Sequence, residues 1–212
     1  MTVDPPHRSL GARPELLLLS GGLDSAALAA WRQPSATLFI DYGQRPAIAE
    51  ARAAAAVASE LGLHHDAISV DAPEIGGGLL VDDVTLPGAP SPEWWPYRNQ
   101  LLVTVAAAWA LRTGRAGHTI VVGSIVSDGS RHADGTRAFY DALDTLLCLQ
   151  EGDVSVSAPA LELESAELVK RSNITDSVLG WTHSCHRANY PCAECPGCYK
   201  RAAVLLELNR LQ

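Results

Sequence analysis

The most constraining feature of the sequence is a glycine turn between a short apolar run and a helical segment. The run Leu16–Leu19 is continuous, as expected of a strand buried on both faces of a parallel sheet. The turn Ser20-Gly21-Gly22 follows it, and residues 24–31 predict a helix. A strand, a tight turn and a helix in this order begin a parallel α/β sheet.

The same alternation continues along the chain. Further strands are predicted at Thr37–Ile40, His65–Val70, Thr119–Val122 and Val154–Val156, and further helices at Ala47–Leu61, Leu101–Leu111, Arg137–Gln150, Glu164–Ser172 and Lys200–Leu211. Residues 123–135 predict a loop. Residues 71–97, with several prolines and the tryptophans Trp94 and Trp95, predict either a functional lid or a disordered excursion. We therefore predict a flexible tail over residues 1–14, a parallel, doubly wound α/β domain over 15–180, and a cysteine-rich segment with a final helix over 181–212.

Composition excludes several classes of protein. Hydrophobic residues make up 47% of the 212 residues, which is enough for a buried core. The net charge of −8 argues against a broadly basic nucleic-acid-binding domain. No apolar run approaches the ~18 residues of a membrane span, and the first fifteen residues lack the apolar core of a secretory signal. We expect a soluble, cytoplasmic protein with no membrane partner.

The glycine turn has the chemistry of an anion site. Backbone N–H groups at a helix start have no partner within the helix, and the helix dipole adds positive charge there. Gly21 and Gly22 let phosphate oxygens approach closely, and Ser20 and Ser25 add hydroxyl donors. Asp24 would repel a phosphate by itself, so it indicates a bridging Mg²⁺ or a hydroxyl partner. The alternative is a tight turn capped by a serine.

Four cysteines lie within 14 positions near the C-terminus. Cys185, Cys192, Cys195 and Cys198 have the spacing of a metal site and not of a disulfide framework. Four thiolates close one structural Zn²⁺ tetrahedrally, and an iron–sulfur cluster is the alternative. Cys148 is predicted to be an ordinary core residue.

Together these motifs resemble a known family. Residues 20–25, SGGLDS, resemble the SGGxDS motif of the PP-loop pyrophosphatase superfamily. With Phe39–Arg45, Pro96–Asn99 and Ser184–Cys198, the chain resembles the QueC family of 7-cyano-7-deazaguanine synthases from about Leu16 to Leu206. The resemblance implies an ATP-binding domain of the adenine nucleotide alpha hydrolase type. It also implies that ATP activates 7-carboxy-7-deazaguanine as an adenylate, which ammonia converts to the amide and then the nitrile. Mg²⁺, a structural Zn²⁺ and a homodimer are further implications.

The resemblance and the residue chemistry together select candidate site residues. The ATP-binding candidates are Ser20, Gly21, Gly22, Leu23, Asp24 and Ser25, and the catalytic candidates are Asp24, Ser25 and Arg98. Arg98 is either a phosphate or carboxylate clamp or a surface arginine. The substrate-binding candidates are Tyr42, Gln44, Arg45, Asn99, Asp128, His132 and Asp134. Each has a simpler alternative: a structural role after a strand, a helix cap, or a solvated loop histidine.

The chain departs from the family pattern at several positions, which marks it as a divergent member. Arg131 and His132 stand where the family has a glycine and a tyrosine, and Pro46 replaces a histidine. Ser165 replaces a lysine, for which Lys170 and Arg171 are the nearest substitutes in sequence. These changes leave the expected use of ATP intact and place the step from amide to nitrile in question.

Three interpretations follow. The first is a synthase that hands the activated deazaguanine to ammonia. The second is a relative from an anti-phage defence system that joins the deazaguanine to a protein amine. The third is a zinc-ribbon module that binds nucleic acid without catalysis, which the acidic charge and the complete motif at residues 20–25 oppose.

Overall fold

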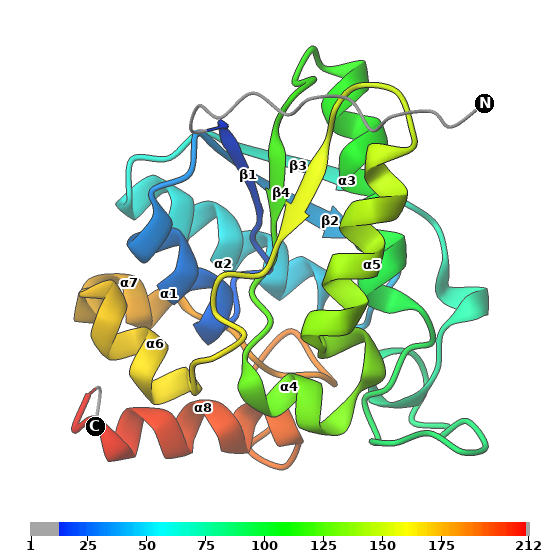
Figure 1. The fold of residues 1–212 in the computed structure, drawn as a ribbon. Helices are drawn as coiled ribbons and strands as arrows, with labels where there is room; N and C mark the ends of the chain where they lie inside the picture. The colour runs from blue at the N-terminus through cyan, green and yellow to red at the C-terminus, as the bar shows by residue number, and fades with distance from the viewer. Residues whose placement is uncertain (1–12, 211–212) are drawn as a thin grey trace.

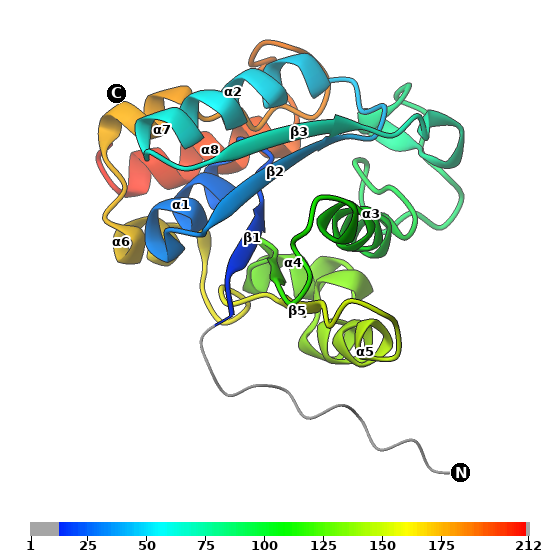
Figure 2. The ribbon, with the colours of Figure 1, turned by 90° about the horizontal axis from the view of Figure 1, so that it is seen from above.

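A computed structural model describes residues 13–210, and these form one five-stranded sheet with helices on both faces (Figures 1 and 2). All strand pairs are parallel, and the strand order is β3-β2-β1-β4-β5. The strands are β1 (Glu15–Leu18), β2 (Ala36–Asp41), β3 (His65–Ser69), β4 (Thr119–Val121) and β5 (Ser155–Ser157). The predicted α/β class and doubly wound architecture are therefore confirmed.

Each face of the sheet has its own buried core, because side chains alternate along parallel strands. Leu17 of β1 faces one side with Phe39 and Val121, while Leu16 faces the other with Ile120. The first side is covered by α1 (Leu23–Arg32), α2 (Ala47–Glu60), α6 (Ser165–Ser172), α7 (Asp176–Trp181) and α8 (Pro196–Glu207). The second is covered by α3 (Arg98–Arg112) and α5 (Arg137–Cys148).

Two elements differ from the sequence prediction. The expected loop at 123–135 contains the helix α4 (Val126–Arg131) and a 3₁₀ turn, η3 (Ala133–Gly135). The helix forms because the carboxylate of Asp128 accepts a hydrogen bond from the Ile125 N–H at 3.1 Å, which closes the first turn. Helix α7 was not predicted. Its start is capped by the Thr175 hydroxyl, which accepts from the Val178 N–H at 3.3 Å.

The segment 71–97 is irregular but ordered. It contains two 3₁₀ turns, η1 (Pro73–Ile75) and η2 (Gly78–Leu80), and the Arg45 N–H donates to the Leu80 carbonyl at 2.9 Å. Trp95 is 1% exposed and packs edge-on against Tyr42, with ring centroids 4.8 Å apart. A disordered excursion is therefore excluded, and the segment forms a fixed wall beyond the carboxyl end of β2.

The ends of the described chain are bound to its body. Of the predicted tail, only residues 13 and 14 are described; the rest lies outside the described residues. The Thr119 N–H donates to the Pro14 carbonyl at 2.9 Å, and Arg13 donates to the Gly117 carbonyl at 2.9 Å. Helix α8 begins four residues earlier than predicted, at Pro196, and ends at Glu207. Within residues 13–210, no helix is both long and apolar enough to cross a membrane.

Candidate active site and metal centre

A cavity of about 340 Å³ opens at the carboxyl ends of β1, β2 and β4. Ligands bind in this position in open parallel sheets. Its wall also includes the starts of α1, α3 and α8, the segment 71–97 and α4. Twelve of the fourteen predicted site residues outside the cysteine cluster line it: Ser20, Gly22, Leu23, Asp24, Ser25, Tyr42, Gln44, Arg98, Asn99, Asp128, His132 and Asp134.

The remaining two predicted residues lie outside the lining. Arg45 points away from the cavity and pairs with Asp83, with its Nη1 2.5 Å from a carboxylate oxygen. The substrate contact predicted for Arg45 therefore has no support in this geometry. Gly21 supports the cavity from behind: its φ is +77°, and a Cβ there would lie 2.6 Å from the Ala54 backbone nitrogen. Only glycine lets α2 pack this closely against the turn.

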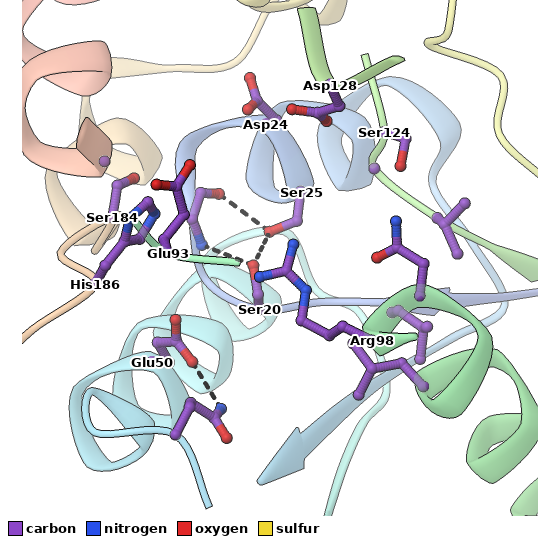
Figure 3. A pocket seen from close by; sticks show the side chains of 18 of the residues that line it. Ser20, Asp24, Ser25, Glu50, Glu93, Arg98, Ser124, Asp128, Ser184 and His186 are labelled. Atoms are coloured by element: carbon purple, nitrogen blue, oxygen red, sulfur yellow. Dashed lines mark hydrogen bonds between the residues drawn. The ribbon is translucent and has the colours of Figure 1, made fainter. Parts of the chain in front are cut away.

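The turn after β1 presents its polar groups toward the start of α1. The hydroxyl oxygens of Ser20 and Ser25 are 3.0 Å apart, and Ser25 also donates to the Gly22 carbonyl at 3.1 Å. The Gly22 N–H donates to the Ser20 hydroxyl at 3.3 Å. Figure 3 shows these hydrogen bonds within the pocket. A folded α1 with hydroxyls gathered at its first turn is a suitable anion site.

Asp24 is paired on one side only. One carboxylate oxygen, Oδ2, lies 2.8 Å from the Lys200 ammonium of α8, while the other, Oδ1, is buried and has no hydrogen-bond partner. Burial acts to lower the pKa of Lys200, but the charges of Asp24 and Asp128 outweigh it and raise that pKa, so the amine is an ammonium. An unpartnered carboxylate oxygen is a suitable ligand for Mg²⁺, so this residue fits the expected ion.

Arg98 begins α3 and is half-buried in the cavity wall. Burial alone would lower its pKa, but nearby Tyr42, Asp134, Asp128 and Glu50 raise it overall. In Figure 3 Asp24 and Asp128 lie at one end of the pocket and Glu50 at the other, with Arg98 between them. The interpretation of Arg98 as a surface arginine is wrong.

Glu50 is a cavity residue that the sequence analysis missed. It lies in the first turn of α2 and accepts a hydrogen bond from the Gln44 side chain at 2.8 Å. The carbonyl of that Gln44 amide accepts from the Tyr42 N–H at 2.8 Å. Burial raises the pKa of Glu50 to about 7, against the lowering effects of the Gln44 hydrogen bond and Arg98. An acid in the first turn of an alanine-rich helix, directly after residues 42–45, was the available signal.

The four predicted cysteines meet in one cluster. Their sulfur atoms all lie within 4.8 Å of one another, with Cys192 and Cys198 4.0 Å apart and Cys185 and Cys195 3.9 Å apart. The sulfur of Cys195 also caps α8 by accepting from the Cys198 N–H at 3.5 Å. A tetrahedral Zn²⁺ with ~2.3 Å bonds needs sulfur atoms ~3.8 Å apart, so the donor set fits a closed structural ion. Cys148, at the end of α5, lies outside this cluster.

Comparison with known proteins identifies the family. The model of the family described as "Queuosine biosynthesis protein QueC" matches residues 15–209. The chain belongs to the QueC family. Two curated relatives, from Acidobacterium capsulatum and Nitrosospira multiformis, are both named 7-cyano-7-deazaguanine synthase. The first is 32% identical and the alignment covers 91% of each chain; the second is 34% identical, covering 89% of this chain and 88% of the relative.

A solved structure is also similar at a greater distance. It is titled "Structure of NMN synthetase from Francisella tularensis" and is 14% identical, with a TM-score of 0.47. The match covers 95% of this QueC chain and 79% of that chain.

Two of the residues that depart from the expected QueC pattern, Arg131 and His132, line the cavity. Arg131 of α4 pairs with Glu93 of the segment 71–97 at 2.6 Å. The neighbouring His132 nitrogen Nε2 lies 3.4 Å from the Ser91 hydroxyl. Burial and then the charge of Arg98 lower the pKa of His132. These two contacts join α4 to the segment 71–97 across the cavity.

The proposed substitutes for the missing QueC lysine are wrongly placed. Ser165 itself is buried and does not line the cavity. Lys170 lies 3.9 Å from Glu207 on the surface, and the Arg171 guanidinium stacks 5.2 Å from the Trp31 ring centre. Lys200 is the lysine in the cavity lining.

The cysteine segment of this QueC chain is bonded directly to the glycine turn. The His183 N–H donates to the Gly21 carbonyl at 2.9 Å, and the Leu23 N–H donates to the Ser184 hydroxyl at 3.3 Å. A metal held by the four cysteines would therefore support the turn as well as the last helix.

Proposed function

We propose that the protein is an ATP-dependent enzyme that activates 7-carboxy-7-deazaguanine and amidates it with ammonia toward 7-cyano-7-deazaguanine. The observation that carries this proposal is the turn at residues 20–25, which opens into a single cavity with Arg98 and Lys200. The cavity volume of about 340 Å³ lies in the range of small-molecule sites. Membership of the QueC family, whose curated relatives are named synthases, supports the same conclusion.

Different groups in the cavity suit the two substrates. The start of α1, with Ser20 and Ser25, would bind the phosphates of ATP. Asp24 would hold Mg²⁺, which supplies charge neutralisation to the phosphates when bound. The carboxylates of Asp128 and Asp134 would accept the N–H donors of the deazaguanine ring, and both raise the pKa of the neighbouring Arg98.

The reaction uses these groups in two steps. The carboxylate of the substrate attacks the α-phosphorus of ATP, and pyrophosphate leaves with the electrons of the broken P–O bond. Ammonia then attacks the activated carbonyl carbon, AMP leaves, and a proton is lost to give the amide. Arg98 is placed to stabilise negative charge as it shifts between carboxylate and phosphate. The nitrile requires a second activation, of the amide oxygen, in the same cavity.

The closed wall favours a small acceptor over a protein amine. Arg131 and Glu93 form an ion pair at 2.6 Å, and His132 lies 3.4 Å from the Ser91 hydroxyl. Both contacts join residues 131 and 132 to the segment 71–97 within the cavity wall, and we infer that this wall leaves little room for the amine of a second protein. Ammonia needs no wide channel. The homodimer implied by the family and the cytoplasmic location expected from the sequence stay predictions.

Product analysis tests the proposal. The protein is incubated with ATP, Mg²⁺, 7-carboxy-7-deazaguanine and ammonium, and the products are identified by mass spectrometry. We expect AMP and pyrophosphate in amounts that depend on the deazaguanine, together with the amide and the nitrile. A deazaguanine mass added to a partner protein supports the defence-type alternative. Release of ADP and phosphate, or AMP release that ignores the deazaguanine, contradicts both.

A further inference from the structure

The cavity contains three cationic side chains that the sequence analysis did not assign to the site. Four cationic side chains line it: Arg98, Arg131, Lys200 and Arg201. Arg131 is held by Glu93 at 2.6 Å. Arg201 donates to the Thr182 hydroxyl at 2.8 Å and to the Leu179 carbonyl at 3.0 Å. Lys200 is also paired, but its partner Asp24 lies in the first turn of α1, where ATP is expected to bind.

Arg98 and Lys200 are attached to different parts of the cavity. Arg98 extends from α3 and lies between Asp24 and Asp128 at one end of the pocket and Glu50 at the other (Figure 3). Lys200 comes from α8, and its ammonium nitrogen lies 2.8 Å from Asp24 in the first turn of α1. An anion that sits on the start of α1 is therefore within reach of Lys200.

The start of α8 is held firmly in this position. Gly197 packs against the Ser184 carbonyl so closely that a Cβ would lie 1.9 Å from it. The hydroxyl of the same Ser184 accepts a hydrogen bond from the Leu23 N–H of α1 at 3.3 Å. The ammonium is thus carried by a helix that packs against Ser184, and Ser184 is hydrogen-bonded to the helix that Lys200 faces.

We propose that Lys200 binds the β- and γ-phosphates of ATP, and hence the departing pyrophosphate, opposite the start of α1. The proposal rests on the proposed function in that ATP is the ligand. Lys200 shares Asp24 with the expected Mg²⁺: one oxygen contacts the ammonium and the other is buried without a partner. An ammonium and a divalent ion on one carboxylate offset the charge of a pyrophosphate group.

Binding measurements with matched variants test this. Dissociation constants of ATP, pyrophosphate and AMP, each with Mg²⁺, are measured by calorimetry on the full metal-loaded chain. Lys200→Met is expected to weaken ATP and pyrophosphate ~10-fold or more, the loss typical of a charged hydrogen bond, and AMP less than ~2-fold. Lys200→Arg is expected to recover most of the affinity. Lys170→Met, which changes the chain's other lysine on the surface, is the control.

The outcomes separate a binding role from a structural one. Unchanged pyrophosphate affinity in Lys200→Met, or an equal loss of AMP, overturns the proposal, because AMP lacks the β- and γ-phosphates. If Lys200→Met does not fold with its metal, Lys200→Gln and Lys200→Arg give the same comparison of a neutral and a charged side chain. A wild-type protein that binds ATP but forms no deazaguanine-dependent AMP overturns the proposed function and leaves this comparison valid.

Discussion

The two sides of the cavity are constructed in different ways. On one side, the turn at residues 20–25 presents backbone N–H groups and hydroxyls that are neighbours in sequence. On the other, α4 and the segment 71–97 are joined by side chains 38 and 41 positions apart, Arg131 with Glu93 and His132 with Ser91. The first construction depends on local conformation, and the second depends on tertiary contacts between individual side chains.

This difference teaches which part of the site can change without loss of the other. Substitutions in the turn alter a backbone that also packs against α2 at Gly21, so few are tolerated. Substitutions at Arg131 or Glu93 alter one ion pair in the cavity wall. We expect changes in the turn to abolish nucleotide chemistry. We expect changes at the Arg131–Glu93 pair to alter how the activated substrate is used.

The largest expected effect concerns the turn side. Asp24→Asn keeps the shape of the side chain and removes the charge that contacts Lys200 and would hold Mg²⁺. Deazaguanine-dependent AMP formation should fall ~10²-fold or more, as when one electrostatic contact to a transition state is lost. The measurement is the initial rate of AMP release. Asp141→Asn, on the exposed face of α5, is the control and should retain the wild-type rate. A comparable rate in Asp24→Asn would mean that the turn does not act on phosphate.

The next effect concerns the metal centre behind the turn. Cys192→Ser removes one of four thiolates and should lower the unfolding free energy by ~3 kcal/mol, or about 10 °C in Tm, with loss of the metal. Thermal unfolding and elemental analysis measure this, with Cys148→Ser as the control outside the cluster. Zinc at one ion per chain is expected. Iron with sulfide, or stable protein without metal, contradicts the zinc assignment.

A smaller effect is expected at the Arg131–Glu93 pair. Glu93→Gln breaks the ion pair with Arg131 and should leave AMP formation within ~3-fold of wild type. Water should then hydrolyse more of the adenylate back to the carboxylate and AMP, so that the ratio of AMP to amide rises ~3-fold or more. The matched control is Glu162→Gln, which breaks an exposed pair with Arg137 at 3.1 Å. An unchanged ratio in both variants would mean that the ion pair does not exclude water.

The smallest effect is a pH dependence of stability. Burial raises the pKa of Glu50 to about 7 from 4.5, so the folded protein binds more protons than the unfolded chain between these values. Stability contributed by Glu50 is therefore present below pH ~4.5 and is lost as the pH rises toward 7. Between pH 5 and 7, Glu50→Gln should lose ~1 kcal/mol less of its free energy of unfolding than the wild type does. Urea unfolding at several pH values measures it, and the exposed Glu151→Gln should follow wild type.

The same contrast explains what the sequence could predict. Local sequence patterns predict the strands, most helices and the turn at residues 20–25. These patterns are apolar runs, alanine-rich segments and glycines. The cysteine cluster could be predicted equally well, because thiolates at this spacing have few other uses. Helix α4 was missed because its sequence, Val-Ser-Asp-Gly-Ser-Arg, has low helix propensity and is stabilised by the Asp128 cap.

The remaining site residues depend on contacts between distant positions. Glu50, Glu93 and Lys200 carry no local motif, and only the folded chain brings them to one cavity. Arg45 shows the reverse, because its position after β2 suggested a ligand contact, whereas in the folded chain it lies outside the cavity lining and pairs with Asp83. Lys170, the nearest lysine in sequence to position 165, lies on the surface, whereas the lysine in the cavity is Lys200 of α8.

The hydrogen bonds between the turn and the C-terminal segment have a consequence for how the protein is made. Asp24 and Lys200 are 176 positions apart, and Leu23 and Ser184 are 161 apart. During synthesis the strands of the sheet leave the ribosome before α8 does, so the anion site stays incomplete until α8 has followed them. Chains released early can pair strands but lack one wall of the cavity, and contacts this distant in sequence are among the slowest to form.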